Sequence, residues 1–235
     1  MPLLLIYNLA IVAAALVGGL LPLVRGWSER VLHLFVAVAT GVFLGTTFVH
    51  LLPEFAALDP GRGPWSLLGI SIVLLFAIER IGLQSSQESG GHAVLGHATL
   101  IGLAVHSVAA GYALGVGRDD DLQRVLFVAM VAHKSVEAFS LTTVLLLAER
   151  SRTAVISMVL FLSMMVPLGT MLGRLTTAAL DERAIVVPLA LGTGTFIYVS
   201  LCDLLPEVFH HREDAWLKVL IIVVGVVATM LLHIH

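Results

Sequence analysis

The chain has 235 residues, of which 58% are hydrophobic and 12% charged, with a mean hydropathy of +1.00 and a net charge of -3. Soluble domains carry about a quarter charged residues, so this composition excludes an ordinary soluble protein and indicates an integral protein of the lipid bilayer. So small a net charge gives no reason to expect a nucleic-acid partner, and the single cysteine cannot form an internal disulfide.

Eight segments are long and apolar enough to cross a membrane, for which a helix needs about 20 mostly apolar residues. They cover about 3–23, 31–52, 65–83, 95–117, 122–147, 153–174, 184–205 and 214–234. The connections are too short for a soluble domain. The sequence therefore predicts an all-α, multi-pass membrane protein that forms one domain over 1–235. The excess of Lys and Arg in alternate loops favours both termini outside. We expect the protein in the cell membrane.

Two of these segments share a motif near their carboxyl ends. Residues 40–43 and 51–54 read Thr-Gly-Val-Phe and Leu-Leu-Pro-Glu, and residues 193–196 and 204–207 read Thr-Gly-Thr-Phe and Leu-Leu-Pro-Glu. The second and seventh helices run in opposite directions, so the motif predicts an inverted repeat of helices 1–3 and 6–8 around helices 4 and 5. This is a common plan of secondary transporters. The alternative is that two helices merely have similar, proline-terminated ends.

The repeat pairs four polar residues, since His50 and Glu54 correspond to Asp203 and Glu207. We expect His50 and Glu54 in a vestibule near the outer surface and Asp203 and Glu207 in one near the inner surface. Each pair could collect or release a hydrated cation. The alternative is that these side chains only mark helix ends at the membrane interface.

Ionisable side chains also lie near the middle of the fourth and fifth predicted helices, where each charge costs about 3 kcal/mol or more. His133 and Glu137 are four residues apart, so a helix places them on one face. His106 lies at a matching depth on the preceding helix, and Lys134 follows His133. Imidazole and carboxylate together suit a divalent transition metal, particularly zinc. The pattern therefore predicts a metal site formed by His106, His133 and Glu137.

At these residues the chain resembles the ZIP family of divalent metal transporters. The fourth helix of that family typically carries His-Ser/Asn-x-x-Asp/Glu-Gly, and the fifth carries His-Lys/Asn-x-x-Glu. Here residues 106–111 read His-Ser-Val-Ala-Ala-Gly and residues 133–137 read His-Lys-Ser-Val-Glu. The Leu-Pro-Glu motifs are also similar, and the resemblance covers all eight helices. It implies a secondary transporter that moves zinc, and in some members iron(II) or manganese(II), towards the cytoplasm as substrate, with no cofactor.

The chain departs from the family pattern at Ala110, where the family usually has a carboxylate. The resemblance still implies that the two histidines and Glu137 are metal ligands. Many relatives bind a second ion through the second residue of each motif, and here those residues are Ser107 and Lys134. Because an ammonium group is a tethered cation, we expect Lys134 to take the place of a second ion. One metal would then be bound by three side chains and water.

Two other functions fit the same residues. An intramembrane zinc hydrolase would use a metal with an open position and a carboxylate base. A non-transporting, metal-binding relative would also fit, since Ala110 removes one family ligand. We expect a transporter and not an enzyme, because an inverted repeat serves alternating access and not hydrolysis. Small residues in the fourth helix allow a homodimer without requiring one.

Overall fold

A computed structural model describes residues 2–58, 62–85, 91–117, 120–176, 186–210 and 213–233, which form helices and no strands. For some helical residues, His50 and Glu54 among them, only the backbone is described. The long helices are α1 (Pro2–Leu20), α2 (Glu29–Gly45), α4 (Arg62–Ser85), α5 (Gly91–Val116), α6 (Asp120–Leu147), α7 (Arg152–Thr176), α8 (Val186–Tyr198) and α10 (Ala215–His233). Two short helices, α3 (Leu52–Leu58) and α9 (Leu205–Val208), extend α2 and α8.

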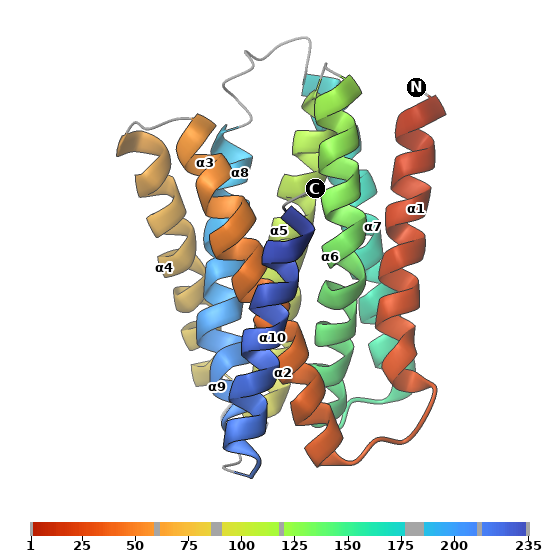
Figure 1. Cartoon of the computed structure of the whole chain (residues 1–235), viewed down its shortest axis with the longest axis vertical. Helices are drawn as coiled ribbons and strands as arrows, with labels where there is room; N and C mark the ends of the chain where they lie inside the picture. Colours follow the sequence, from red (N-terminus) through yellow and green to blue (C-terminus); the bar gives the residue numbers. More distant parts are fainter. Residues whose placement is uncertain are drawn as a thin grey trace.

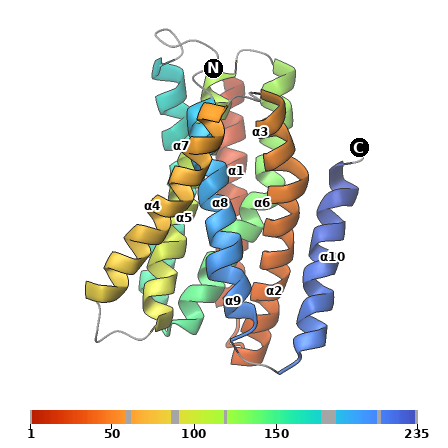
Figure 2. The same cartoon turned by 90° about the vertical axis from the view of Figure 1, so that its left-hand side faces the viewer.

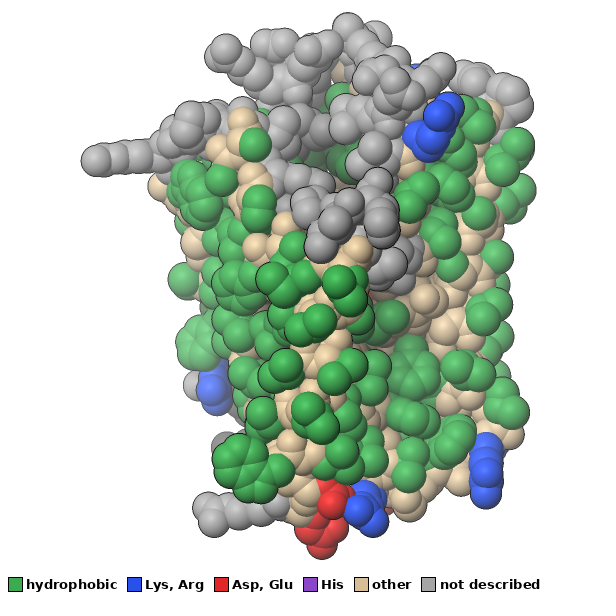
Figure 3. All heavy atoms as spheres, in the orientation of Figure 1, with side chains coloured by type: hydrophobic (Ala, Val, Ile, Leu, Met, Phe, Trp, Pro, Cys, Tyr) green, Lys and Arg blue, Asp and Glu red, His purple; other side chains and the backbone are tan. Residues whose placement is uncertain are grey.

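Seven helical stretches of the described chain are long and apolar enough to cross a membrane, and they coincide with the first seven predicted segments. The eighth predicted segment is a shorter apolar helix, Ala215–Leu231. Among the side chains that Figure 3 colours by type, most are hydrophobic, and the few charged ones lie mainly near the ends of the bundle. Large apolar side chains such as Leu9, Val73 and Val224 are exposed by more than half. This surface matches lipid tails and not water, so the chain is a multi-pass membrane protein.

The helices pack in two groups. In one group α1 contacts α6 and α7, and α5 contacts α7; in the other α2 contacts α10, and α4 contacts α8. Contacts of α5 with α8 and of α2 with α6 join the groups (Figures 1 and 2). The helices alternate in direction, and the lower end of the bundle in Figure 1 is the end at which α2 begins and α9 ends. Helices α5 and α6 therefore run through the middle of the bundle, in contact with both groups.

Two π turns interrupt the long helices that carry the repeated motif. They lie at Thr46–Leu51, between α2 and α3, and at Val199–Leu204, between α8 and α9. The starts of the two turns are 153 residues apart, from 46 to 199, which is also the spacing of the Thr-Gly motifs at 40 and 193. Pro53 and Pro206 each follow a turn as the second residue of the next helix. Helix α3 runs past Pro53 to its end at Leu58, so this proline does not terminate it.

Glycines bring α5 unusually close to α7. A Cβ atom on Gly111 would lie 2.2 Å from the carbonyl oxygen of Val166, and one on Gly169 would lie 2.1 Å from the carbonyl oxygen of Val108. Real side chains do not fit at such distances, so only glycine allows the two backbones to approach this closely. The contact fixes α5, which carries the first predicted metal ligand, against α7.

Candidate metal centre

Three potential metal ligands come together in the middle of the bundle. His106 lies on α5, and His133 and Glu137 lie one turn apart on α6. The ligand atoms that they offer all lie within 4.8 Å of one another, and the two imidazole centroids are 5.9 Å apart. His106 and Glu137 are buried and His133 is half-buried. Within the described part of the chain, this is the one group of three or more such residues that could hold a metal ion.

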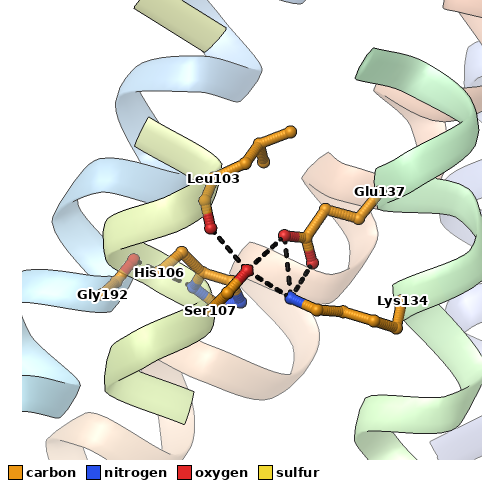
Figure 4. Close-up of polar contacts among 6 residues, drawn as sticks. All are labelled: Leu103, His106, Ser107, Lys134, Glu137 and Gly192. Carbon is orange, nitrogen blue, oxygen red and sulfur yellow. Dashed lines mark hydrogen bonds and ion pairs between the residues drawn. The ribbon is translucent and has the colours of Figure 1, made fainter. Parts of the chain in front are cut away.

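A backbone carbonyl from another helix orients His106. Its Nδ1 lies 3.2 Å from the carbonyl oxygen of Gly192 on α8 (Figure 4), and because a carbonyl only accepts, Nδ1 must be the protonated nitrogen. This leaves Nε2, which is buried and has no hydrogen-bond partner among the described residues, as the ligating atom. Metal-binding histidines commonly hold their second ring nitrogen in this way. The ring also packs on Phe196, with centroids 4.2 Å apart.

Lys134 reaches across the centre to Glu137 and Ser107. Its ammonium nitrogen lies 2.8 and 2.7 Å from the two carboxylate oxygens of Glu137 and 2.6 Å from the Ser107 hydroxyl (Figure 4). Ser107 in turn lies 2.9 Å from Glu137 and 2.6 Å from the carbonyl of Leu103. Lys134 is 1% exposed and Glu137 is fully buried. All three ammonium protons therefore have acceptors, as a charge buried this deeply requires.

The three side chains offer the donor atoms of a tetrahedral metal site, and one of them, Glu137, is also paired with the ammonium group of Lys134. Two imidazole nitrogens and a carboxylate oxygen are typical zinc ligands, and three of them leave a fourth position for water or for an exchanging ligand. The charges of Lys134 and Glu137 cancel, so a metal ion at this site would compete with Lys134 for the carboxylate.

Ala110 lies one turn beyond His106 on α5, and its surroundings are apolar. It packs against a cluster of buried side chains from α1, α5, α6 and α7, formed by Tyr7, Ile11, Leu114, Met130 and Val166. Ala110, which stands where the family usually has a carboxylate, is therefore in contact with apolar side chains.

The predicted inner residues are buried in the lower half of the bundle. Asp203 is 1% exposed, and one of its oxygens accepts a hydrogen bond of 3.2 Å from Thr99 on α5. A Glu207 oxygen lies 3.4 Å from Nε2 of His33 on α2, and both residues are buried. The side chains of the predicted outer residues, His50 and Glu54, lie outside the described residues.

His33 escaped the sequence reasoning. It lies near the start of a mostly apolar predicted helix, and an ionisable side chain in such a helix was the signal that could have identified it. Its partner Glu207 is 174 residues away in the chain. No spacing rule could have paired them.

The chain is similar to known proteins over most of its length. Residues 78–233, about two thirds of the chain, match the family model described as ZIP zinc transporter. The chain is 27% identical over 262 residues to zinc transporter ZIP9-B of Xenopus laevis, covering 88% of this chain and 86% of that protein. It is 26% identical over 247 residues to human zinc transporter ZIP1, covering 84% of this chain and 76% of that protein.

The family model spans α5, α6, α8 and α10 entirely, and so includes every residue of the candidate metal centre. The similarity to the two relatives extends over most of both chains. Together with the motifs at His106 and His133, these matches show that the chain belongs to the ZIP zinc transporter family.

Proposed function

We propose that this protein is a secondary transporter that moves zinc, or a similar divalent cation such as iron(II) or manganese(II), across the membrane by alternating access. The observation that carries the proposal is the cluster of His106, His133 and Glu137 in the middle of a membrane-spanning bundle. Ionisable groups at such a depth are costly and mark ion pathways. The relatives that match most of the chain are named zinc transporters.

The site holds one metal ion per chain, with Lys134 in place of a second ion. The ammonium lies at hydrogen-bond distance from Ser107 and from both oxygens of Glu137, where a second cation would be placed by the family motif. A second divalent ion at that point would meet a fixed positive charge in a medium of low dielectric constant, which opposes its binding.

Alternating access is served by an inverted repeat of α1, α2 and α4 with α7, α8 and α10, making eight crossings in one domain. The common spacing of 153 residues for motif and π turn supports this reading. The packing supports it too, because α2 contacts α10 just as α8 contacts α4. Phe43 and Phe196, equivalent in the two copies, stack with centroids 4.4 Å apart.

Ions enter through a vestibule at His50 and Glu54 and leave past Asp203 and Glu207. With both termini outside the cell membrane, the lower end of the bundle faces the cytoplasm and transport runs towards it. The burial of Asp203 and Glu207 at that end supports a path for cations through an otherwise apolar interior.

The contacts of Glu137 favour a transporter over an intramembrane hydrolase. A hydrolase would need a carboxylate to accept a proton from metal-bound water. Glu137 is also a metal ligand in the cluster, and both its oxygens accept hydrogen bonds from Lys134. A carboxylate that binds the ion and pairs with an ammonium group is a poor proton acceptor, because both interactions favour its ionised form.

The test is uptake of radioactive zinc into proteoliposomes that contain the purified protein. We expect saturable uptake by the wild type, at least tenfold lower uptake by His133→Ala, and unchanged uptake by the matched control His97→Ala, whose histidine is exposed at the start of α5. Inhibition of zinc uptake by iron(II) and by manganese(II) would show how strongly each ion competes with zinc for transport. No saturable uptake by correctly folded wild-type protein would refute the proposal.

A further inference from the structure

We propose that His33 and Glu207 form a second binding site for a divalent metal ion, at the lower end of the bundle. The site joins α2 to α9, and none of its residues belongs to the central cluster. Its role as a station for departing ions rests on the transport function proposed above, but its ability to bind metal does not.

The orientation of His33 repeats that of the central histidine. Nδ1 of His33 lies 2.9 Å from the backbone carbonyl oxygen of Glu29, so Nδ1 is the protonated nitrogen, as it is in His106. Nε2 is thereby turned to the Glu207 carboxylate. A ring nitrogen fixed by a backbone carbonyl, with the other nitrogen facing a carboxylate, is a common arrangement at metal sites.

The distance between the facing atoms suits two ligands of one ion. Nε2 of His33 and the nearer oxygen of Glu207 are 3.4 Å apart. Two zinc bonds of about 2.0–2.1 Å at a tetrahedral angle place their ligand atoms about 3.3–3.4 Å apart. A second proton, on Nε2, would pair His33 with this carboxylate as an imidazolium, and a metal ion between the two atoms would take the place of that proton. Both side chains are at least 95% buried, so water screens the attraction between the carboxylate and a cation only weakly.

A cavity next to the pair is lined by three further acidic residues and two basic ones. A cavity of about 200 Å³ is lined by His33 together with Glu29, Arg30, Glu213, Asp214 and Lys218. Arg30 is held by Asp214, with Nη2 and a carboxylate oxygen 2.9 Å apart. Figure 3 shows acidic and basic side chains together at this lower end, below the hydrophobic side of the bundle. The cavity would supply the remaining ligands as water and give the ion a route to solvent.

The spacing of the two sites fits successive stations on one path. Gly192 contacts His106, and Glu207 lies 15 residues further along α8, its π turn and α9. At a rise of about 1.5 Å per residue the two sites are roughly 20 Å apart. Asp203 lies between them in the chain, and its second carboxylate oxygen is buried without a hydrogen-bond partner among the described residues. A cation leaving the centre would thus pass a further carboxylate.

The test is a zinc titration of the untagged full-length protein in nanodiscs, by competition with a chromophoric chelator. We expect two zinc ions per chain for the wild type and for the control His97→Ala, and one for His133→Ala. Adding His33→Ala or Glu207→Gln to His133→Ala should remove the remaining ion, or weaken its binding at least tenfold. Cobalt(II) substituted into His133→Ala should give the intense visible bands of a tetrahedral site.

Glu207→Gln retains the shape of the buried side chain, so it decides the matter if His33→Ala fails to fold. The inference is overturned if His133→Ala binds no zinc, or if its one ion survives both second substitutions, as it would if His33 held only a proton. If instead zinc binding depends on His33 and Glu207 but not on His133, this site stands and the central site of the proposed transporter fails.

Discussion

Lys134 and Glu137, one turn apart on α6, form a buried ion pair in which one ammonium nitrogen contacts both carboxylate oxygens, at 2.8 and 2.7 Å. The same carboxylate is a candidate metal ligand. The ammonium and the carboxylate together form a charge-neutral pair that a metal ion bound to Glu137 would disturb. We therefore expect Lys134 to influence metal affinity, although it cannot itself coordinate as an ammonium group.

Replacing Lys134 with methionine keeps the length of the side chain and removes its charge. We expect Lys134→Met to bind zinc at least tenfold more tightly, because the ion no longer shares Glu137. The metal-free variant should be less stable, since breaking a buried ion pair costs about 3–5 kcal/mol. Chelator competition and thermal unfolding with and without zinc measure the two effects. Equal or weaker zinc binding would show that Lys134 does not compete with the ion.

Ala110→Asp restores the carboxylate that the family usually has on the fourth helix. We expect zinc affinity to rise about tenfold, because a further anionic ligand lies one turn from His106. The metal-free protein should lose stability, as the new charge faces the apolar cluster around Leu114 and Met130. The isosteric variant Ala110→Asn is the matched control in calorimetric zinc titrations. If the two variants bind zinc equally, position 110 does not face the metal.

Gly111→Ala tests the close contact between α5 and α7. The added methyl group would lie 2.2 Å from a backbone oxygen of Val166, so the helices must separate. Overpacking of this kind costs about 1–3 kcal/mol and would also shift His106, five residues earlier on α5. Gly69→Ala is the matched control, because nothing lies within 4 Å of its added carbon. In thermal unfolding, the melting temperature should fall for Gly111→Ala and not for Gly69→Ala. Equal melting temperatures of the two variants would argue against the tight contact between α5 and α7.

The ion pair between Arg30 and Asp214 ties the start of α2 to the segment before α10. The Arg30 guanidinium, chiefly through its hydrogen bond, holds the pKa of the Asp214 carboxyl below its usual range. A depressed pKa stabilises the folded state above the unfolded pKa of about 3.9, and this stabilisation is lost as the pH falls through the folded pKa. The difference in melting temperature between wild type and Asp214→Asn should therefore be constant from pH 5 to 7 and shrink below about pH 4. A difference that is undiminished at pH 3 would contradict this pairing.

Much of the architecture follows from periodicity and hydropathy. The first seven predicted segments coincide with membrane-length helices because burial in lipid requires long apolar runs, which are visible in any sequence. The shared face of His133 and Glu137 follows from their spacing on one helix. The matching depth of His106 predicted that it lies near His133 and Glu137. In the structure the potential ligand atoms of the three side chains lie within 4.8 Å of one another.

The contacts between distant segments could not be predicted in this way. The hydrogen bond that orients His106 comes from a carbonyl group 86 residues further along the chain, and backbone carbonyls leave no mark in a sequence. The ion pair of Lys134 with Glu137 has the i,i+3 spacing of a helix, but the sequence could not show that the ammonium points inward to Ser107. Such contacts depend on helix rotation and packing, which local patterns leave undetermined.

The two π turns have a consequence for how this chain tolerates insertions and deletions. A π turn holds one residue more than an α-helical turn of the same rise, so losing one residue there would repair the helix instead of breaking it. Because the extra residue is contained within that one turn, everything beyond the repaired turn would keep its orientation. Deleting Cys202, an exposed residue within the turn Val199–Leu204, should therefore leave a folded bundle in which Glu207 still faces His33. A single lost codon in this turn would spare both the centre and the polar contact at the lower end, whereas the same loss in a regular helix would rotate everything beyond it by about 100°.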